Sequence, residues 1–466
     1  MDVLLRGGKL VTPQGVCPSD LLIRGEKIEA IGPDLEAGYA ELIDVTGMLL
    51  LPGGIDVHTH LELKTPTANS SDDWYTGTAA AAYGGTTTVV DHPSFGPAGC
   101  SVFHQIDAYH ELASSKAIID YSFHGVIQHV DEQVVHDIEE LVSRGIVSSK
   151  VYLTYDHALS DGEIIRFLES MKHAGGLTAF HCENDGVVKH YRRAFQAAGK
   201  TLPIYHAKSR PHTAEAEAVA RVIRLAETVG DAPVYIVHLS TASGLEEIRR
   251  GRERGLPIFA ETCPQYLLLD ETRYNEPGDE GLKYILSPPL RTRADIESLW
   301  EGVADGAIQT IGTDHAPFTF EVKRNLSSGG FLSCPNGMPG IEARLMLLYT
   351  AGVAAGRISL ERFVEVVSTL PAKIMGLYPR KGVLCRGSDA DIVVLDPQKR
   401  VTLTHAMLHE RVDYTPYEGI ELAGFPVLTI RRGEIIVDGG ELRAHAGSGR
   451  FIKRKTPNLA GLEISR

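Results

Sequence analysis

The chain has 466 residues, of which 43% are hydrophobic and 23% are charged, which is the ordinary composition of a soluble globular protein. Its formal net charge of -14 argues against a nucleic acid or an anionic membrane surface as a partner. No apolar stretch approaches the length of a membrane span, and the first residues lack the basic flank and apolar run of a signal peptide, so we expect a cytoplasmic protein.

Both ends of the chain have the pattern of short strands separated by turns. Residues 1–52 contain the runs VLLRGGKLVT, DLLIRGEKIEAIG and GMLLLPG, with glycine at the breaks. The same pattern returns from about residue 380, for example in PVLTIRRGEIIVDGG. We therefore predict one small β-sandwich domain built from residues 1–52 and 379–466, with residues 53–378 inserted between its two parts.

Residues 53–378 alternate apolar, β-branched runs with helical patterns. Several of the helical patterns end in glycine, as helices commonly do. Such alternation predicts an α/β fold, a (β/α)8 TIM-like barrel, whose active site forms at the carboxyl ends of its strands. The eight predicted strands are residues 54–60, 86–92, 118–126, 147–153, 177–181, 234–239, 258–262 and 308–313.

The ends of these strands carry side chains that can bind metal ions. In the first strand, LPGGIDVHTH, side chains alternate between faces, so Asp56, His58 and His60 point the same way. Neutral imidazole is a common zinc ligand, although a polar strand end whose histidines only form hydrogen bonds has the same pattern. Four imidazoles and a carboxylate exceed what one tetrahedral ion needs, so we predict two metal ions that share a ligand and a bridging hydroxide. Later strand ends supply the remaining candidates, which are Lys150, His181, His238 and Asp314.

Lys150 is the unusual member of this set. Burial beside two cations disfavours an ammonium and lowers the pKa of the amine. A neutral amine reacts with carbon dioxide to give a carbamate (N6-carboxylysine), whose two oxygens can bridge two metals. The alternative is a lysine paired with an acid near the barrel rim. The convergence with five other ligand residues favours the carbamate.

Eight motifs follow one another at the intervals of the barrel strands: PGGIDVHTH, KVYLTY, HCEN, VHLS, ETCPQYLLLD, ILSPPLR, TDHAPF and CPNGMPG. Together they make the chain resemble the dihydropyrimidinase and hydantoinase family of cyclic amidohydrolases, within the amidohydrolase superfamily, over nearly its whole length. The segments DYSFHGVIQH and KVYLTYDHALSDGE look most like those of bacterial D-phenylhydantoinases.

The resemblance implies roles for individual residues. His58, His60 and Asp314 would hold one metal, His181 and His238 the second, and carboxylated Lys150 would bridge both. Tyr155 matches the tyrosine that hydrogen-bonds the developing oxyanion, and Asp314 would move the proton to the leaving nitrogen. Ser287 and Asn336 match positions that hold the ring amide of the substrate. Without the resemblance, a rim tyrosine, a turn serine and an Asn-Gly turn would be the plainer interpretations of these last three.

The function implied is ring opening of 5-substituted aryl D-hydantoins to N-carbamoyl-D-amino acids. The near alternative is a dihydropyrimidinase that opens dihydrouracil or dihydrothymine to N-carbamoyl-β-amino acids. Allantoinase and dihydroorotase use the same metal chemistry on more polar rings, and a metal-free scaffold would have lost ligands that are all present here. Zinc is the expected metal, although manganese, cobalt and nickel suit the same ligands. The resemblance also implies a homotetramer, in which the basic tail 450–455 is a candidate subunit contact.

Overall fold

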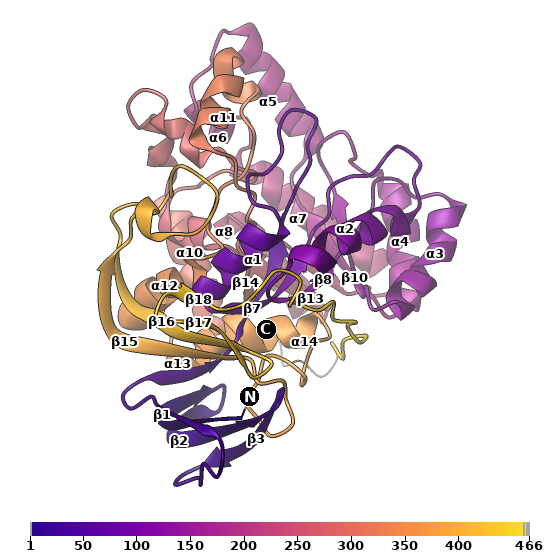
Figure 1. Ribbon diagram of the computed structural model, residues 1–466. Coiled ribbons are helices and arrows are strands. Elements are labelled where there is room, and N and C mark those ends of the chain that lie inside the picture. The colour runs from indigo at the N-terminus through magenta and orange to yellow at the C-terminus, as the bar shows by residue number, and fades with distance from the viewer. Residues whose placement is uncertain (1, 460–461, 463–466) are drawn as a thin grey trace.

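The structure is a computed structural model that describes residues 2–459 and residue 462. Strands from both ends of the chain form one nine-stranded sheet, in the order β18-β17-β16-β15-β5-β1-β2-β3, with β4 paired to β1. The two chain ends meet where β5 pairs with β15, with Leu50 opposite Val394 (Figure 1). These strands are β1 (Val3–Thr12), β2 (Gly15–Arg24), β3 (Lys27–Gly32), β4 (Glu41–Asp44), β5 (Leu49–Pro52), β15 (Ile392–Thr402), β16 (Glu421–Arg431), β17 (Glu434–Asp438) and β18 (Glu441–Leu442).

The nine-stranded sheet folds over a core of its own. Leu21 on β2 and Ile430 on β16 belong to one buried cluster, although three strands separate β2 from β16 in the sheet. The sheet must therefore curl so that its two halves face each other, which gives the sandwich arrangement expected for the small domain. The boundaries at residues 52 and 378 stay a prediction.

The inserted segment forms the barrel. Its strands are β6 (Gly54–Thr59), β7 (Thr86–Asp91), β8 (Asp120–Phe123), β9 (Gly125–Val126), β10 (Ser148–Tyr152), β11 (Leu177–His181), β12 (Val234–Ile236), β13 (Ile258–Thr262) and β14 (Thr310–Ile311). They pair in parallel as β6-β7-β8 and as β14-β13-β12-β11-β10-β9. Asp314 N donates to His58 O (2.9 Å) and His60 N donates to His315 O (2.9 Å), which closes the barrel between its last and first strands.

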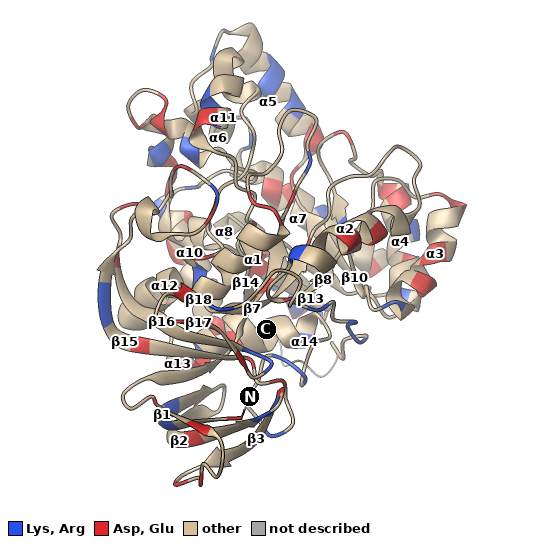
Figure 2. Cartoon of the chain, in the orientation of Figure 1, with Lys and Arg blue, Asp and Glu red and all other residues tan. Residues whose placement is uncertain are grey.

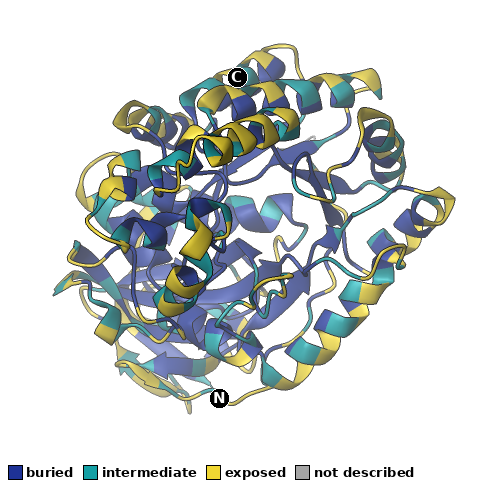
Figure 3. Cartoon of the chain, turned by 90° about the horizontal axis from the view of Figure 1, so that it is seen from above, coloured by how far each residue is buried: buried dark blue, intermediate teal, exposed yellow. Residues whose placement is uncertain are grey.

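Helices surround these strands, with their buried faces toward the strands and their exposed faces outward (Figure 3). Side-chain caps fix several helix starts, as at Ser160 before α4 and Thr292 before α10. Charged side chains of both signs lie on the outer helices α3 to α5 (Figure 2). Within the described residues, no helix is long and apolar enough to cross a membrane. The helices are α1 (Trp74–Tyr83), α2 (Val102–Lys116), α3 (Glu132–Ser143), α4 (Asp161–His173), α5 (Asp185–Ala197), α6 (Ile204–Lys208), α7 (His212–Thr228), α8 (Ala242–Glu253), α9 (Pro264–Leu268), α10 (Arg293–Asp305), α11 (Phe320–Leu326), α12 (Arg344–Leu348), α13 (Leu360–Val364) and α14 (Leu370–Ile374).

Two features differ from the sequence expectations. The third barrel strand, expected over 118–126, is divided at His124 into β8 and β9. The basic tail does not lie wholly on the surface, because the Arg454 side chain is buried, whereas Arg450, which pairs with Glu26 (2.7 Å), is exposed. A subunit contact by this tail stays a prediction, now restricted to its exposed residues.

Candidate metal centre

Three of the expected ligands meet at the carboxyl end of the barrel. The Oδ1 atom of Asp314 lies 3.3 Å from His58 Nε2 and 3.1 Å from His60 Nε2. One ligand atom from each of these residues lies within 4.8 Å of the others, which is close enough to share one ion. The side chains of His60 and Asp314 are slightly exposed, at 12% and 13%, so this group opens toward solvent while His58 is enclosed.

Asp56 holds the segment before Asp314 against the strand that carries the two histidines. The Asp56 carboxylate accepts hydrogen bonds from the Thr313 hydroxyl (2.6 Å) and the Thr313 amide (3.2 Å), which ties the segment after β14 to β6. Asp314 then has a positive φ of 53°, so the chain turns and its side chain faces the barrel mouth. His238 and Tyr155 also have positive φ values, of 38° and 71°. Such backbone strain in non-glycine residues is common at functional sites.

Lys150, His181 and His238 lie beside the first three ligands. Lys150 Nζ is 3.5 Å from His58 Nε2. The His238 ring centroid is 5.3 Å from that of His58 and 4.5 Å from that of His181. The six residues therefore form one continuous cluster, drawn from β6, β10, β11 and the segments after β6, β12 and β14.

The electrostatic state of this cluster fits cation binding. Burial lowers the pKa of His58 and His238 well below the ordinary value, which keeps both rings in the neutral form that binds metal. Burial also lowers the pKa of Lys150 to about 8, and no carboxylate of the described residues lies within 4 Å of its amine. The Nδ1 atoms of His60 and His238 are buried without a hydrogen-bond partner among the described residues. These side chains thus fit a site for divalent cations.

Two buried glutamates each contact a ring nitrogen of one candidate ligand histidine. Glu261, on β13, lies 2.6 Å from His58 Nδ1 and also accepts from the Tyr235 hydroxyl (2.8 Å). Glu183 lies 2.8 Å from His181 Nε2 and pairs with the Arg210 guanidinium. Sequence reasoning gave Glu183 and Arg210 no individual role. The only signal for Glu183 was its place two residues after His181.

The Arg210 guanidinium also lies over the Tyr155 ring, 5.7 Å from its centroid, and this ring is 5.2 Å from that of His181. Burial raises the pKa of Tyr155 to about 12, so its hydroxyl keeps its proton at neutral pH. One arginine therefore contacts both the tyrosine and the carboxylate behind a candidate ligand.

Ser287 and Asn336 lie on segments that meet near Asp314. Gly337 N donates to Ile285 O (3.0 Å), which holds the loop of Asn336 against that of Ser287. Ala316 N donates to Met338 O (3.2 Å), which places the Asn336 loop beside the chain that follows Asp314. The Ser287 hydroxyl is buried without a hydrogen-bond partner among the described residues.

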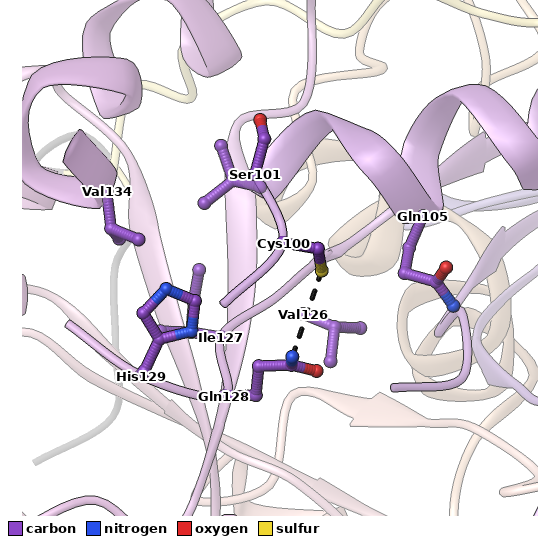
Figure 4. A pocket seen from close by; sticks show the side chains of 9 residues that line it. Cys100, Ser101, Gln105, Val126, Ile127, Gln128, His129 and Val134 are labelled. Carbon is purple, nitrogen blue, oxygen red and sulfur yellow. Dashed lines mark hydrogen bonds between the residues drawn. The ribbon is translucent and has the colours of Figure 1, made fainter. Parts of the chain in front are cut away.

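The other histidines of the barrel mouth make different contacts. His92 lies between two other histidines: it stacks on His124 (4.0 Å between centroids) and its ring is tilted against that of His58 (4.3 Å). His315 faces away from the cluster and lies 3.0 Å from the Asp72 carboxylate. A small pocket beside the start of α2, lined by Cys100, Gln105, Gln128 and His129 among others, contains none of the proposed ligands (Figure 4).

Comparison with known proteins identifies a family and several similar enzymes. The model of the "Amidohydrolase family" matches residues 49–436. The chain is 47% identical over 456 residues to a D-phenylhydantoinase of Escherichia coli O1:K1, with 98% of each chain covered. Among solved structures, dihydropyrimidinase from Brevibacillus agri NCHU1002 has a TM-score of 0.96 at 42% identity, covering 98% of this chain and 99% of that chain. D-Hydantoinase from Bacillus sp. AR9 has a TM-score of 0.95 at 43% identity, covering 97% and 99%.

Proposed function

The chain belongs to the amidohydrolase family, and we propose that it opens the ring of 5-substituted D-hydantoins, including aryl ones, to give N-carbamoyl-D-amino acids. It is a hydrolase of cyclic amides. The observation that carries the proposal is the approach of His58, His60 and Asp314 to one another at the barrel mouth, in a chain similar over its full length to a D-phenylhydantoinase.

We propose that His58, His60 and Asp314 hold one divalent cation, that His181 and His238 hold another, and that carboxylated Lys150 contacts both. Zinc suits these ligands, and manganese, cobalt and nickel are compatible with them. When bound, two such cations acidify water and polarise the carbonyl group of the ring amide. The enclosed amine of Lys150, with its pKa of about 8, has the neutral fraction that carbamate formation requires.

The chain's own residues would carry the proton and orient the ring. The Asp314 carboxylate accepts the proton that water loses as it attacks the ring carbonyl, and passes it to the ring nitrogen as the carbon–nitrogen bond breaks. The Tyr155 hydroxyl, protonated at neutral pH, donates a hydrogen bond to the oxygen that gains charge. The segments of Ser287 and Asn336, which meet at the Gly337–Ile285 hydrogen bond, would present polar groups to the ring amide.

The metal proposal is tested by Lys150→Ala. We expect the purified variant to lose both ions and all measurable hydrolysis, because the carboxylated lysine that we propose to contact both ions cannot form. Carbamate formation consumes carbon dioxide, so bicarbonate should speed metal uptake by the wild-type apoprotein and have no effect on Lys150→Ala. A variant that retains two ions and full activity would contradict the bridging role.

Substrate choice is tested by initial rates on D-5-phenylhydantoin, its L enantiomer and dihydrouracil. We expect the D-aryl substrate to react fastest. Dihydropyrimidinase activity is the second candidate, because a solved neighbour carries that name, and faster opening of dihydrouracil would establish it. A homotetramer is also proposed, and light scattering coupled to size-exclusion chromatography would measure the mass of the assembly.

A further inference from the structure

The C-terminal tail forms part of the barrel wall. Tyr121 N donates to Arg450 O (3.0 Å) and Ile452 N donates to Tyr121 O (2.7 Å), so the tail pairs with the edge of β8 that faces away from β7. The approach is close, because a Cβ atom at Gly449 would lie 2.0 Å from Ile119 O. The tail therefore lies where the amino-terminal half of the third barrel strand would otherwise meet β10.

From this position the Arg454 side chain is buried within the barrel. Its Nε donates to Ser122 Oγ (3.0 Å), its Nη1 to Ser148 Oγ (2.8 Å), and its Nη2 to Phe123 O. No carboxylate of the described residues lies within 4 Å of it, and burial lowers the pKa of Arg454 to about 9. Burying a cation among neutral oxygens is costly, so these hydrogen bonds must be kept for the tail to stay in place.

The hydrogen bonds beyond Arg454 have a fixed direction. His124 Nε2 lies 3.0 Å from Val57 O, which can only accept, so Nε2 carries the proton of the neutral ring. His124 Nδ1 is then an acceptor, and the Ser148 hydroxyl, 2.7 Å away, donates to it. A guanidinium can only donate, so Ser148 Oγ accepts from Arg454, which keeps the hydroxyl proton directed away from the guanidinium and toward His124.

His124 in turn touches the strand that carries the candidate ligands. Val57 stands directly before His58 on β6. The His124 ring also stacks on His92 at an interplanar angle of 11°, and the His92 ring is 4.3 Å from that of His58. Both ring nitrogens of His92 are buried without a hydrogen-bond partner among the described residues, so packing between His124 and His58 holds this ring.

We propose that Arg454 is a positioning residue for the metal centre: it orients the Ser148 hydroxyl, which holds the His124 ring at Nδ1, and His124 in turn anchors β6 and packs His92 against His58. This inference rests on the proposed metal centre. It gives the C-terminal tail a function in the active site of its own chain, separate from any contact between subunits.

Two serines allow a matched test. Ser148→Ala and Ser122→Ala each remove one hydroxyl partner of Arg454, but only Ser148→Ala breaks the connection to His124. The holoproteins would be compared by the rate of metal release to a chelator, by the visible spectrum after cobalt substitution, and by kcat and KM on D-5-phenylhydantoin. For Ser148→Ala we expect metal release to be about 10-fold faster, a changed cobalt spectrum, and a lower kcat with KM unchanged. Ser122→Ala should release metal at the wild-type rate and keep the wild-type spectrum.

Arg454→Met should change metal release and the spectrum in the same direction as Ser148→Ala. If Arg454→Met does not fold, the comparison of Ser148→Ala with Ser122→Ala still tests the proposal. Equal metal release and identical spectra in the two serine variants would overturn the inference while leaving the metal centre intact. A wild-type protein that binds no divalent ion would overturn the proposed centre, and the inference with it.

Discussion

Arg210 connects two side chains of the site that lie on different loops. Its guanidinium pairs with Glu183, which holds His181, and it also lies over the Tyr155 ring. Removing this cation leaves a buried carboxylate beside a candidate metal ligand and removes the contact to the tyrosine. For Arg210→Met we therefore expect kcat to fall about 10- to 100-fold and the metal at His181 to bind more weakly.

Metal titration and steady-state kinetics on one preparation would measure both effects. Arg192→Met is the control, because Arg192 contacts Phe331 and donates to Leu332 O (2.9 Å) but makes no hydrogen bond to Glu183. Equal losses in the two variants would mean that Arg210 acts only through general stability.

The candidate ligand residues could be identified from sequence, because alternation along a strand and the position of a strand end are local properties. His58 and His60 follow from one strand, and Asp314 from the end of another. Arg210 could not be predicted in the same way. Its partner Glu183 is 27 residues away, and only the tertiary fold brings the two charges together.

At the scale of the element, the sequence patterns located all eight barrel strands but did not predict the backbone conformation at the ends of the strands. His238 and Asp314 lie beyond β12 and β14, in turns with positive φ that no hydrophobic pattern reports. The break at His124 occurs where the tail pairs with β8. This contact joins residues more than 300 positions apart, so the periodicity within one strand cannot predict it.

The loops after β7 and β10 meet through aromatic rings at the barrel mouth. The Phe95 ring lies 5.0 Å from that of Tyr152 and 4.1 Å from that of His157, centroid to centroid. This cluster stands beside Tyr155, whose ring is 6.0 Å from that of Tyr152. It is therefore a candidate wall for an aryl substituent of the substrate.

For Phe95→Ala we expect KM for D-5-phenylhydantoin to rise about 10-fold, which is the scale of one lost aromatic contact. Unsubstituted hydantoin serves as the internal control, because it has no ring to place against this wall and its KM should change little. If both values of KM rise together, Phe95 shapes the loop rather than contacting the substituent.

At the scale of the whole molecule, one buried lysine joins the barrel to the small domain. The Lys381 ammonium lies 2.8 Å from Asp120 at the start of β8, and 3.3 Å and 2.5 Å from Asp389 and Asp391 in the small domain. These three carboxylates are close enough together to resemble a cation site, but the chain's own cations already pair with them: Lys381 contacts all three, Arg432 pairs with Asp120, and Arg380 and Lys27 pair with Asp389. The contact links segments 261 residues apart.

Replacing Lys381 with methionine should separate the charge of this network from its packing. Removing the cation leaves the buried Asp391 without an ion-pair partner and takes one cation from Asp120 and Asp389, so we expect the free energy of unfolding at pH 7 to fall by about 3–5 kcal/mol, measured by denaturant titration. Lys27→Met is the matched control, because Lys27 pairs with the same Asp389 but has a side chain that is 49% exposed. Its replacement should cost less than about 1 kcal/mol.

The pH dependence gives an independent check on this network. Burial by itself would raise the pKa of Asp389, but the neighbouring cations, Lys381 foremost, hold it below its ordinary value. A carboxyl group with a lowered pKa stabilises the fold above its unfolded-state pKa, and this contribution is lost as the pH falls through the folded-state value, below about pH 4. Through Asp389 the wild-type protein should therefore lose stability in acid, whereas the buried Asp391, whose pKa is raised by burial, contributes in the opposite direction.

In Lys381→Met the carboxyl groups lack the charge of Lys381, so they bind protons at a higher pH and protonation relieves their repulsion. The difference in unfolding free energy between the two proteins should therefore narrow as the pH falls from 7 to below about 4. A difference that stays constant would mean that Lys381 acts through packing alone.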